Sequence, residues 1–142
     1  MVATIYHQFI IKSDIKKVFD AVTVPKELEH WWPLICSGTV KKGAEYNFYF
    51  GEPYNWFAEI SDIHLNQSVE YKITKADDDW APTTFAFYLT SDGESTVINF
   101  EHRNWQLENN HFKVASFCWA MLLDGLKNYL EKGIVIPFKE RS

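Results

Sequence analysis

The segment FKVASFCWAMLLDGLKNYLEKG, residues 112–133, decides the fold. Its main apolar stripe recurs at intervals of three and four residues, the spacing of one face of an α-helix. A second apolar strip runs beside the first, so the expected buried arc is wide. Gly133 follows Lys132 and is a natural C-terminal stop. The sequence therefore predicts one long helix over 112–133, with a main stripe of Ala115, Cys118, Trp119, Leu122, Leu126, Tyr129 and Leu130 and a second strip of Val114, Phe117 and Met121.

In the sequence before this helix, apolar and polar residues alternate, which is typical of half-buried antiparallel strands. The clearest case is SVEYKIT, residues 68–74, and the turn clusters GEPYN (51–55) and SDGE (91–94) separate such strands. A further strand is predicted over residues 4–12, which are rich in β-branched and aromatic side chains. The side chains expected on the inner face are Tyr46, Phe48, Phe50, Val69, Tyr71, Ile73, Phe85, Phe87, Leu89, Thr96, Ile98, Phe100 and His102.

Two short helices are expected between the first strand and the others. Ser13 fits an N-cap, with Asp14 in the first turn, where a negative charge suits the helix dipole. A second helix is predicted over residues 25–31, begun by Pro25 and stopped by Pro33. Helices segregated from an antiparallel sheet predict an α+β domain in two layers, formed by the whole chain, residues 1–142.

Composition narrows the classes of function. The formal net charge is -5 and no basic run occurs, which argues against binding to nucleic acids or to membrane surfaces. No stretch is apolar enough to span a bilayer, and no secretory signal is recognisable at the start. Cys36 and Cys118 are far apart and typical of free thiols in a reducing compartment. We expect a cytoplasmic monomer or homodimer.

Two blocks of sequence carry a family resemblance. VFDAVTVPKELEHWW (residues 18–32) and the last helix, with Trp119 and LLDGLKNYLEKG (122–133), resemble the activator of heat-shock-protein-90 ATPase homologue-like family. That family belongs to the START/birch-pollen-allergen-like (SRPBCC) helix-grip superfamily. The resemblance implies a seven-stranded sheet that grips the C-terminal helix around a cavity for a small apolar molecule. It covers nearly the whole chain but departs from the family pattern at several positions, among them Cys118, where a glycine is common.

Aromatic residues make up 17% of the chain, and many fall on the face that would meet the last helix. Rings of this size either fill a solid core or line a cavity, and both interpretations stay open. For the adjacent indoles, the family resemblance implies that one faces the cavity and the other seals the helix pair against the sheet, and we expect Trp32 in the cavity and Trp31 at the seal. The candidate cavity residues are Trp32, Tyr46, Phe48, Phe50, Trp56, Ile60, Asp62, Tyr71, Ile73, Phe85, Phe87, Phe100, His102, Trp119, Leu122 and Leu126.

Two of these candidates are ionisable. Asp62 is either a solvated carboxylate at a strand end or a polar anchor in the cavity. His102 is either a rim histidine or an acid or base at the cavity mouth. The sequence has no metal-ligand spacing, no activated nucleophile and no glycine-rich phosphate loop, so neither a metal nor a cofactor is expected.

Three functions follow as alternatives. The first is a carrier or sensor of a small apolar molecule, with a closed pocket. The second is a co-chaperone-like module that binds a protein partner through its surface and has a collapsed interior. The third is a cyclase- or hydratase-type enzyme, which needs an acid–base pair inside the pocket. Trp80, in the acidic loop 75–82, helps to discriminate, because an exposed indole favours a protein surface and a folded-in indole acts as a lid.

Overall fold

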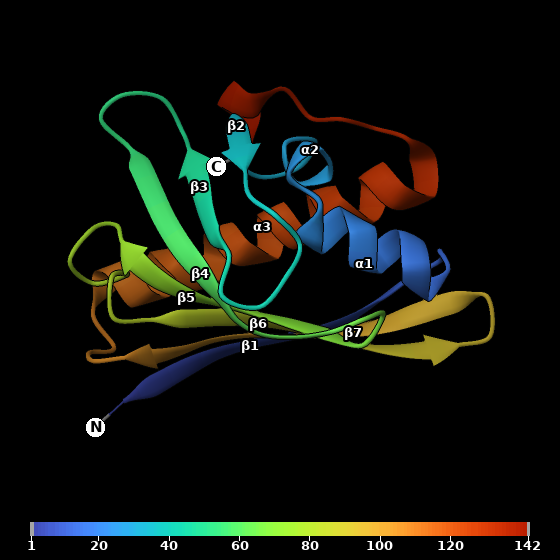
Figure 1. The fold of residues 1–142 in the computed structure, drawn as a ribbon, viewed down its shortest axis with the longest axis horizontal. Coiled ribbons are helices and arrows are strands. Elements are labelled where there is room, and N and C mark those ends of the chain that lie inside the picture. Colours follow the sequence, from blue (N-terminus) through green and yellow to red (C-terminus); the bar gives the residue numbers. More distant parts are fainter. Residues whose placement is uncertain (1, 142) are drawn as a thin grey trace.

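The computed structural model describes residues 2–141 and has the expected two layers. A seven-stranded antiparallel sheet bends around one long helix, and two short helices lie beside that helix (Figure 1). The predicted α+β class is confirmed. The elements in chain order are β1 (Ala3–Ile11), α1 (Ile15–Thr23), α2 (Pro25–Leu28), β2 (Ile35–Ser37), β3 (Glu45–Tyr49), β4 (Asn55–His64), β5 (Ser68–Lys75), β6 (Thr84–Asp92), β7 (Ser95–Trp105), α3 (Asn110–Lys132) and a 3-10 turn, η1 (Phe138–Glu140).

The strand order across the sheet is β1-β7-β6-β5-β4-β3-β2. Every neighbouring pair is antiparallel, so β1 and β2 form the two edges. The α1–α2 pair connects these edges, which places it at one end of the groove formed by the bent sheet (Figure 1). This arrangement brings Trp32, which follows α2, into contact with Phe50, which follows β3.

Helix α3 has clear stop signals at both ends. The Asn109 side chain accepts a hydrogen bond from the Phe112 amide, and Gly133 adopts a left-handed conformation with φ 69°. An N-cap side chain and a left-handed glycine satisfy main-chain groups that the helix leaves unpaired. The residues buried from α3 are Ala115, Trp119, Leu122, Leu123, Gly125 and Leu126.

The buried arc of α3 is narrower than the sequence predicts. The second apolar strip faces solvent: Val114 is 57% exposed, Phe117 65% and Met121 37%. Periodicity identifies this strip but does not reveal whether another element covers it. We refer to Val114, Phe117 and Met121 as the α3 strip.

The short helices differ in detail from the prediction. The N-cap of α1 is Asp14, whose carboxylate accepts from the Lys17 amide at 3.0 Å, and Ser13 is the buried residue before it. A carboxylate is as good an N-cap as a hydroxyl, so either residue fits the sequence pattern. Helix α2 ends at Leu28, three residues before the predicted end at 31.

After Gly133 the chain turns back and ends beside β2 and α2 (Figure 1). We call residues 134–141 the terminal segment. Both cysteines are free thiols. In the part of the chain that the structure describes, no helix is long and apolar enough to cross a membrane.

Candidate functional site

The inner faces of the sheet and α3 bring most of the candidate rings into one array. Trp119 lies at its centre, with its ring centroid 4.5 Å from Phe100, 4.9 Å from Trp32 and 5.6 Å from Phe85. These separations are those of aromatic rings in direct contact. The other rings of the array are Tyr46, Phe48, Phe50, Trp56, Tyr71 and Phe87, and the aliphatic candidates Ile60, Ile73 and Leu126 are buried in the same core.

The two buried tyrosines make hydrogen bonds to the end of α1. The Tyr46 hydroxyl donates to the Thr23 carbonyl at 2.6 Å, and the Tyr71 hydroxyl donates to the Val22 carbonyl at 2.7 Å. Burial raises the pKa of both phenols, so they remain neutral donors. These bonds attach the sheet to α1 and leave neither O–H free to donate to a guest molecule.

His102 is completely buried, and both ring nitrogens have partners. Its Nδ1 accepts from the Trp119 indole N–H at 3.0 Å, because an indole can only donate. Nε2 therefore carries the proton and donates to the Thr83 hydroxyl at 2.7 Å. Desolvation, and secondarily the charge of His111, lowers the pKa of His102 to about 3. The expectation of a histidine at the rim or mouth is wrong, and His102 is a neutral core residue.

Asp62 also departs from the expected place. A β-bulge between Ile60 and Asp62 shifts the register of β4 against β5. Because one extra residue reverses the facing of those that follow, Ile63 packs against the core in place of Asp62. The Asp62 carboxylate is partly exposed, 3.3 Å from His64 Nε2. Asp62 is therefore a solvated carboxylate near the end of β4, which is the first of the two interpretations given above.

The acidic loop folds inward at Trp80, which is only 8% exposed. Its ring lies 4.8 Å from Trp56 and 4.6 Å from His102. The indole N–H donates to His111 Nε2 at 3.1 Å, and His111 Nδ1 lies 3.0 Å from Asp79. Trp80 therefore closes one end of the ring array.

The adjacent indoles Trp31 and Trp32 occupy the opposite end. The Trp31 N–H donates to the Ala21 carbonyl at 2.9 Å, which ties the turn after α2 to α1. Trp32 contacts the ring array through Phe48 and Phe85. The two rings lie 6.1 Å apart and nearly parallel, so together they form a wall at this end of the domain.

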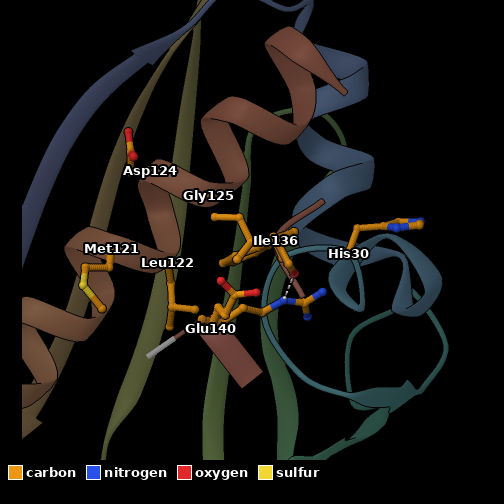
Figure 2. Close-up of a pocket in the computed structure, with 9 residues that line it drawn as sticks. His30, Met121, Leu122, Asp124, Gly125, Ile136 and Glu140 are labelled. Atoms are coloured by element: carbon orange, nitrogen blue, oxygen red, sulfur yellow. Dashed lines mark hydrogen bonds between the residues drawn. The ribbon is translucent and has the colours of Figure 1, made fainter. Parts of the chain in front are cut away.

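The terminal segment lies across this wall. Ile136 lies beside Gly125 of α3, and a Cβ built on this glycine would be in ordinary van der Waals contact with Ile136 Cδ1, at 3.8 Å (Figure 2). Arg141 anchors the end of the segment: Nη1 donates to the carbonyls of Glu29 at 2.8 Å, Pro33 at 3.2 Å and Trp32 at 3.3 Å. Among residues 2–141, the backbone of 135–141 hydrogen-bonds only within itself and to the Arg141 side chain.

Two grooves flank the terminal segment. The helix groove, of about 250 Å³, lies along α3 (Figure 2), and the aromatic groove, of about 290 Å³, lies beside Trp32. They share Leu122 and Arg141. The helix groove is lined by His30, Trp31, Met121, Leu122, Asp124, Gly125, Ile136, Glu140 and Arg141, and the aromatic groove by Trp32, Phe50, Tyr54, Leu122, Phe138, Lys139 and Arg141.

Of the candidate cavity residues, Trp32, Phe50 and Leu122 line these grooves, and most of the others lie deeper in the ring array. The sequence did not point to the terminal segment, because residues 134–141 show neither helical nor strand periodicity. The apolar run IVIPF after the helix stop at Gly133 is the signal that could have found it. No cluster of metal-ligating side chains occurs among residues 2–141.

A family model described as Activator of Hsp90 ATPase homolog 1-like protein matches residues 12–131. The chain belongs to this family. The match includes α1, α2, the sheet from β2 to β7 and nearly all of α3, and it ends just before the terminal segment. Comparison with curated protein sequences finds no match to this chain.

Solved structures share the fold of this Activator of Hsp90 ATPase homolog 1-like chain. The Aha1 dimer from Colwellia psychrerythraea has a TM-score of 0.84 and 26% identity, over 92% of this chain and 98% of that one. Protein SSP2350 from Staphylococcus saprophyticus has a TM-score of 0.80 and 18% identity, over 94% and 96%. CalU16 from Micromonospora echinospora has a TM-score of 0.74 and 16% identity, over 99% and 83%. The last two likenesses concern the fold alone.

Proposed function

We propose that this protein binds a small apolar molecule at the end of the domain where the terminal segment crosses α3. The observation that carries the proposal is the pair of grooves on the two sides of that segment, which reach Trp31 and Trp32. Their volumes, about 250 and 290 Å³, lie just below the usual range of small-molecule pockets. Apolar floors with a few polar groups at the edges are typical of such pockets.

The ring array argues for this location over the interior. A guest between the sheet and α3 would have to part rings that are already in contact, such as Phe100 and Trp119. It would also find the Tyr46, Tyr71 and His102 polar atoms already hydrogen-bonded. In the grooves, a guest would displace only the terminal segment. That segment is held by apolar packing of Ile136 and by the hydrogen bonds of Arg141.

The folded-in Trp80 favours a ligand-binding function over partner binding through the acidic loop. An enzyme would need an acid–base pair, and the two ionisable candidates from the sequence do not form one. Asp62 faces His64 outside the core, and His102 is neutral and buried. These observations argue against an enzyme. Because the interior is solid and not hollow, the proposal of a carrier or sensor rests on the two grooves.

The proposal is tested with a neutral probe, 1-naphthalenemethanol, titrated into the protein by calorimetry. Tyr54 lines the aromatic groove and is 52% exposed, so Tyr54→Ala removes part of the binding surface with little effect on folding. We expect binding to weaken by about threefold to tenfold, as for one aromatic contact. Tyr6→Ala is the matched control, since Tyr6 is 68% exposed on the far edge strand β1. Absence of binding, or equal loss in both variants, would contradict the proposal.

A second candidate function is a protein-interaction module, which the α3 strip favours together with the family description. Exposed apolar side chains in a row on one helix are typical of a partner surface. The partner suggested by the family is the heat-shock-protein-90 ATPase. In this case Phe117→Ser should weaken binding to purified heat-shock protein 90 by about thirtyfold, as at an interface hot spot. Leu107→Ser, at an exposed site outside α3, is the control. Equal affinity of both variants would exclude the α3 strip as the interface.

A further inference from the structure

The charges of the aromatic groove suggest which chemical class of molecule it takes. Its charged lining residues are Lys139 and Arg141, both cationic, in a chain whose net charge is -5. The helix groove on the other side of the terminal segment is different, because Asp124 and Glu140 line it (Figure 2). Arg141 lines both grooves, but in the helix groove two carboxylates offset its charge, whereas in the aromatic groove Lys139 adds to it. The aromatic groove is therefore the more favourable of the two for an anion.

Arg141 is the most informative residue of the aromatic groove. It is only 8% exposed, yet among residues 2–141 no carboxylate lies within ion-pair distance of its guanidinium. Its partners are main-chain carbonyls: Nη1 bonds to three of them, and Nε donates to Ile136 at 2.9 Å. Carbonyl dipoles orient a guanidinium but do not neutralise it, and a buried charge normally has a counter-ion.

The Nη2 group of Arg141 makes no hydrogen bond to any residue that the structure describes. A guanidinium presents its donors in a planar fork that matches a carboxylate. Lys139 is exposed on the same groove and supplies a second cation. Burial lowers the pKa of Arg141, as expected for a cation with no anionic neighbour, although an arginine stays protonated.

We infer that the aromatic groove binds an aromatic monocarboxylate, with the carboxylate directed at Lys139 and the free edge of Arg141 and the ring seated against Trp32 and Phe50. This inference rests on the proposed function and names the class of ligand. The rings of Trp32 and Phe50 lie 5.6 Å apart at 58° to one another, so they offer two differently oriented aromatic surfaces. A ligand with a single negative charge suits this groove, because its cationic side chains are few and the rest of its lining is mostly aromatic.

The test compares two probes of almost the same shape, 1-naphthaleneacetate and the uncharged 1-naphthaleneacetamide, by calorimetry at low salt. We expect the carboxylate to bind at least about tenfold more tightly, as for hydrogen bonds to a charged group. Lys139→Gln should reduce that preference by about threefold through the loss of one exposed ion pair, and leave the affinity for the amide unchanged. Lys113→Gln, an exposed lysine near the start of α3, is the matched control.

The outcomes separate the two proposals. Equal affinity for acid and amide, or a preference that Lys139→Gln does not reduce, overturns the carboxylate inference and leaves apolar binding in place. Failure of both probes to bind overturns the proposed function itself. Because Lys139 is exposed and makes no ion pair with another described residue, its replacement tests the charge without disturbing the fold.

Discussion

Replacing Trp119 with alanine is expected to lower the free energy of unfolding by about 3–5 kcal/mol. The ring contacts Phe100, Trp32 and Phe85, so its removal leaves a cavity that these side chains can only partly fill. It also leaves the buried Nδ1 of His102 without its donor. Urea denaturation measures the change as a lower midpoint at an unchanged slope.

Phe117→Ala is the control, because this residue lies on the same helix and is 65% exposed. This substitution should change the free energy of unfolding by no more than about 0.5 kcal/mol. A loss below about 1 kcal/mol for Trp119→Ala would mean that the ring borders empty space, and the solid ring array would be wrong.

The second large effect is a loss of stability in mild acid that originates at His102. The folded state holds this imidazole neutral, with a pKa of about 3, whereas the unfolded chain binds a proton below its ordinary value of 6.5. The stabilisation is therefore complete above pH 6.5 and is lost as the pH falls toward about 3. Over this interval the loss is roughly 3–6 kcal/mol, with a slope of about 1.4 kcal/mol per pH unit.

Urea unfolding between about pH 6.5 and about pH 5 separates this effect from the carboxylates, which titrate mostly below that range. Glu131, for example, has a pKa lowered by its hydrogen bonds to Lys127 and Lys12, so it contributes only in stronger acid. The His102→Phe variant should be less stable at neutral pH, but its free energy of unfolding should not fall with pH over this range. His64→Gln, which changes an exposed histidine, should retain that fall. A flat profile for the unmodified protein would contradict the neutral buried imidazole.

The sequence was sufficient for the elements with strong local signals. The three- and four-residue spacing from Ala115 to Leu126, with the stop at Gly133, identified α3, and the alternation in residues 68–74 identified β5. The large rings of the inner strand faces were also recognisable, because a side chain's facing follows from the period of two.

The errors arise where tertiary context decides. The bulge after Ile60 turned Asp62 outward, and a bulge has no clear signature in an alternating strand. His102 looked like a rim residue because strand length does not reveal that Trp80 folds over it. The α3 strip looked buried because periodicity marks apolar faces whether or not they are covered.

The candidate site was likewise predictable only in part. Phe50 and Leu122 were identified as cavity residues from their facing and Trp32 from the family resemblance, and all three line the grooves. The remaining residues of the grooves come from the terminal segment, whose position depends on long-range hydrogen bonds from Arg141 and on the packing of Ile136 beside Gly125 of α3. Neither feature has a local pattern, so sequence reasoning expected a cavity among the rings, whereas the grooves lie beside them.

The central claim is that the interior is a solid ring array and that a small apolar molecule binds in the grooves beside the terminal segment. It is tested most directly by an NMR titration with 1-naphthalenemethanol that follows backbone amides and the six indole N–H groups. We predict that the largest shifts occur at Trp31, Trp32 and the amides of residues 134–141. Shifts centred instead on Tyr71 and Phe100, with the terminal segment unchanged, would place the guest inside the ring array and contradict the claim.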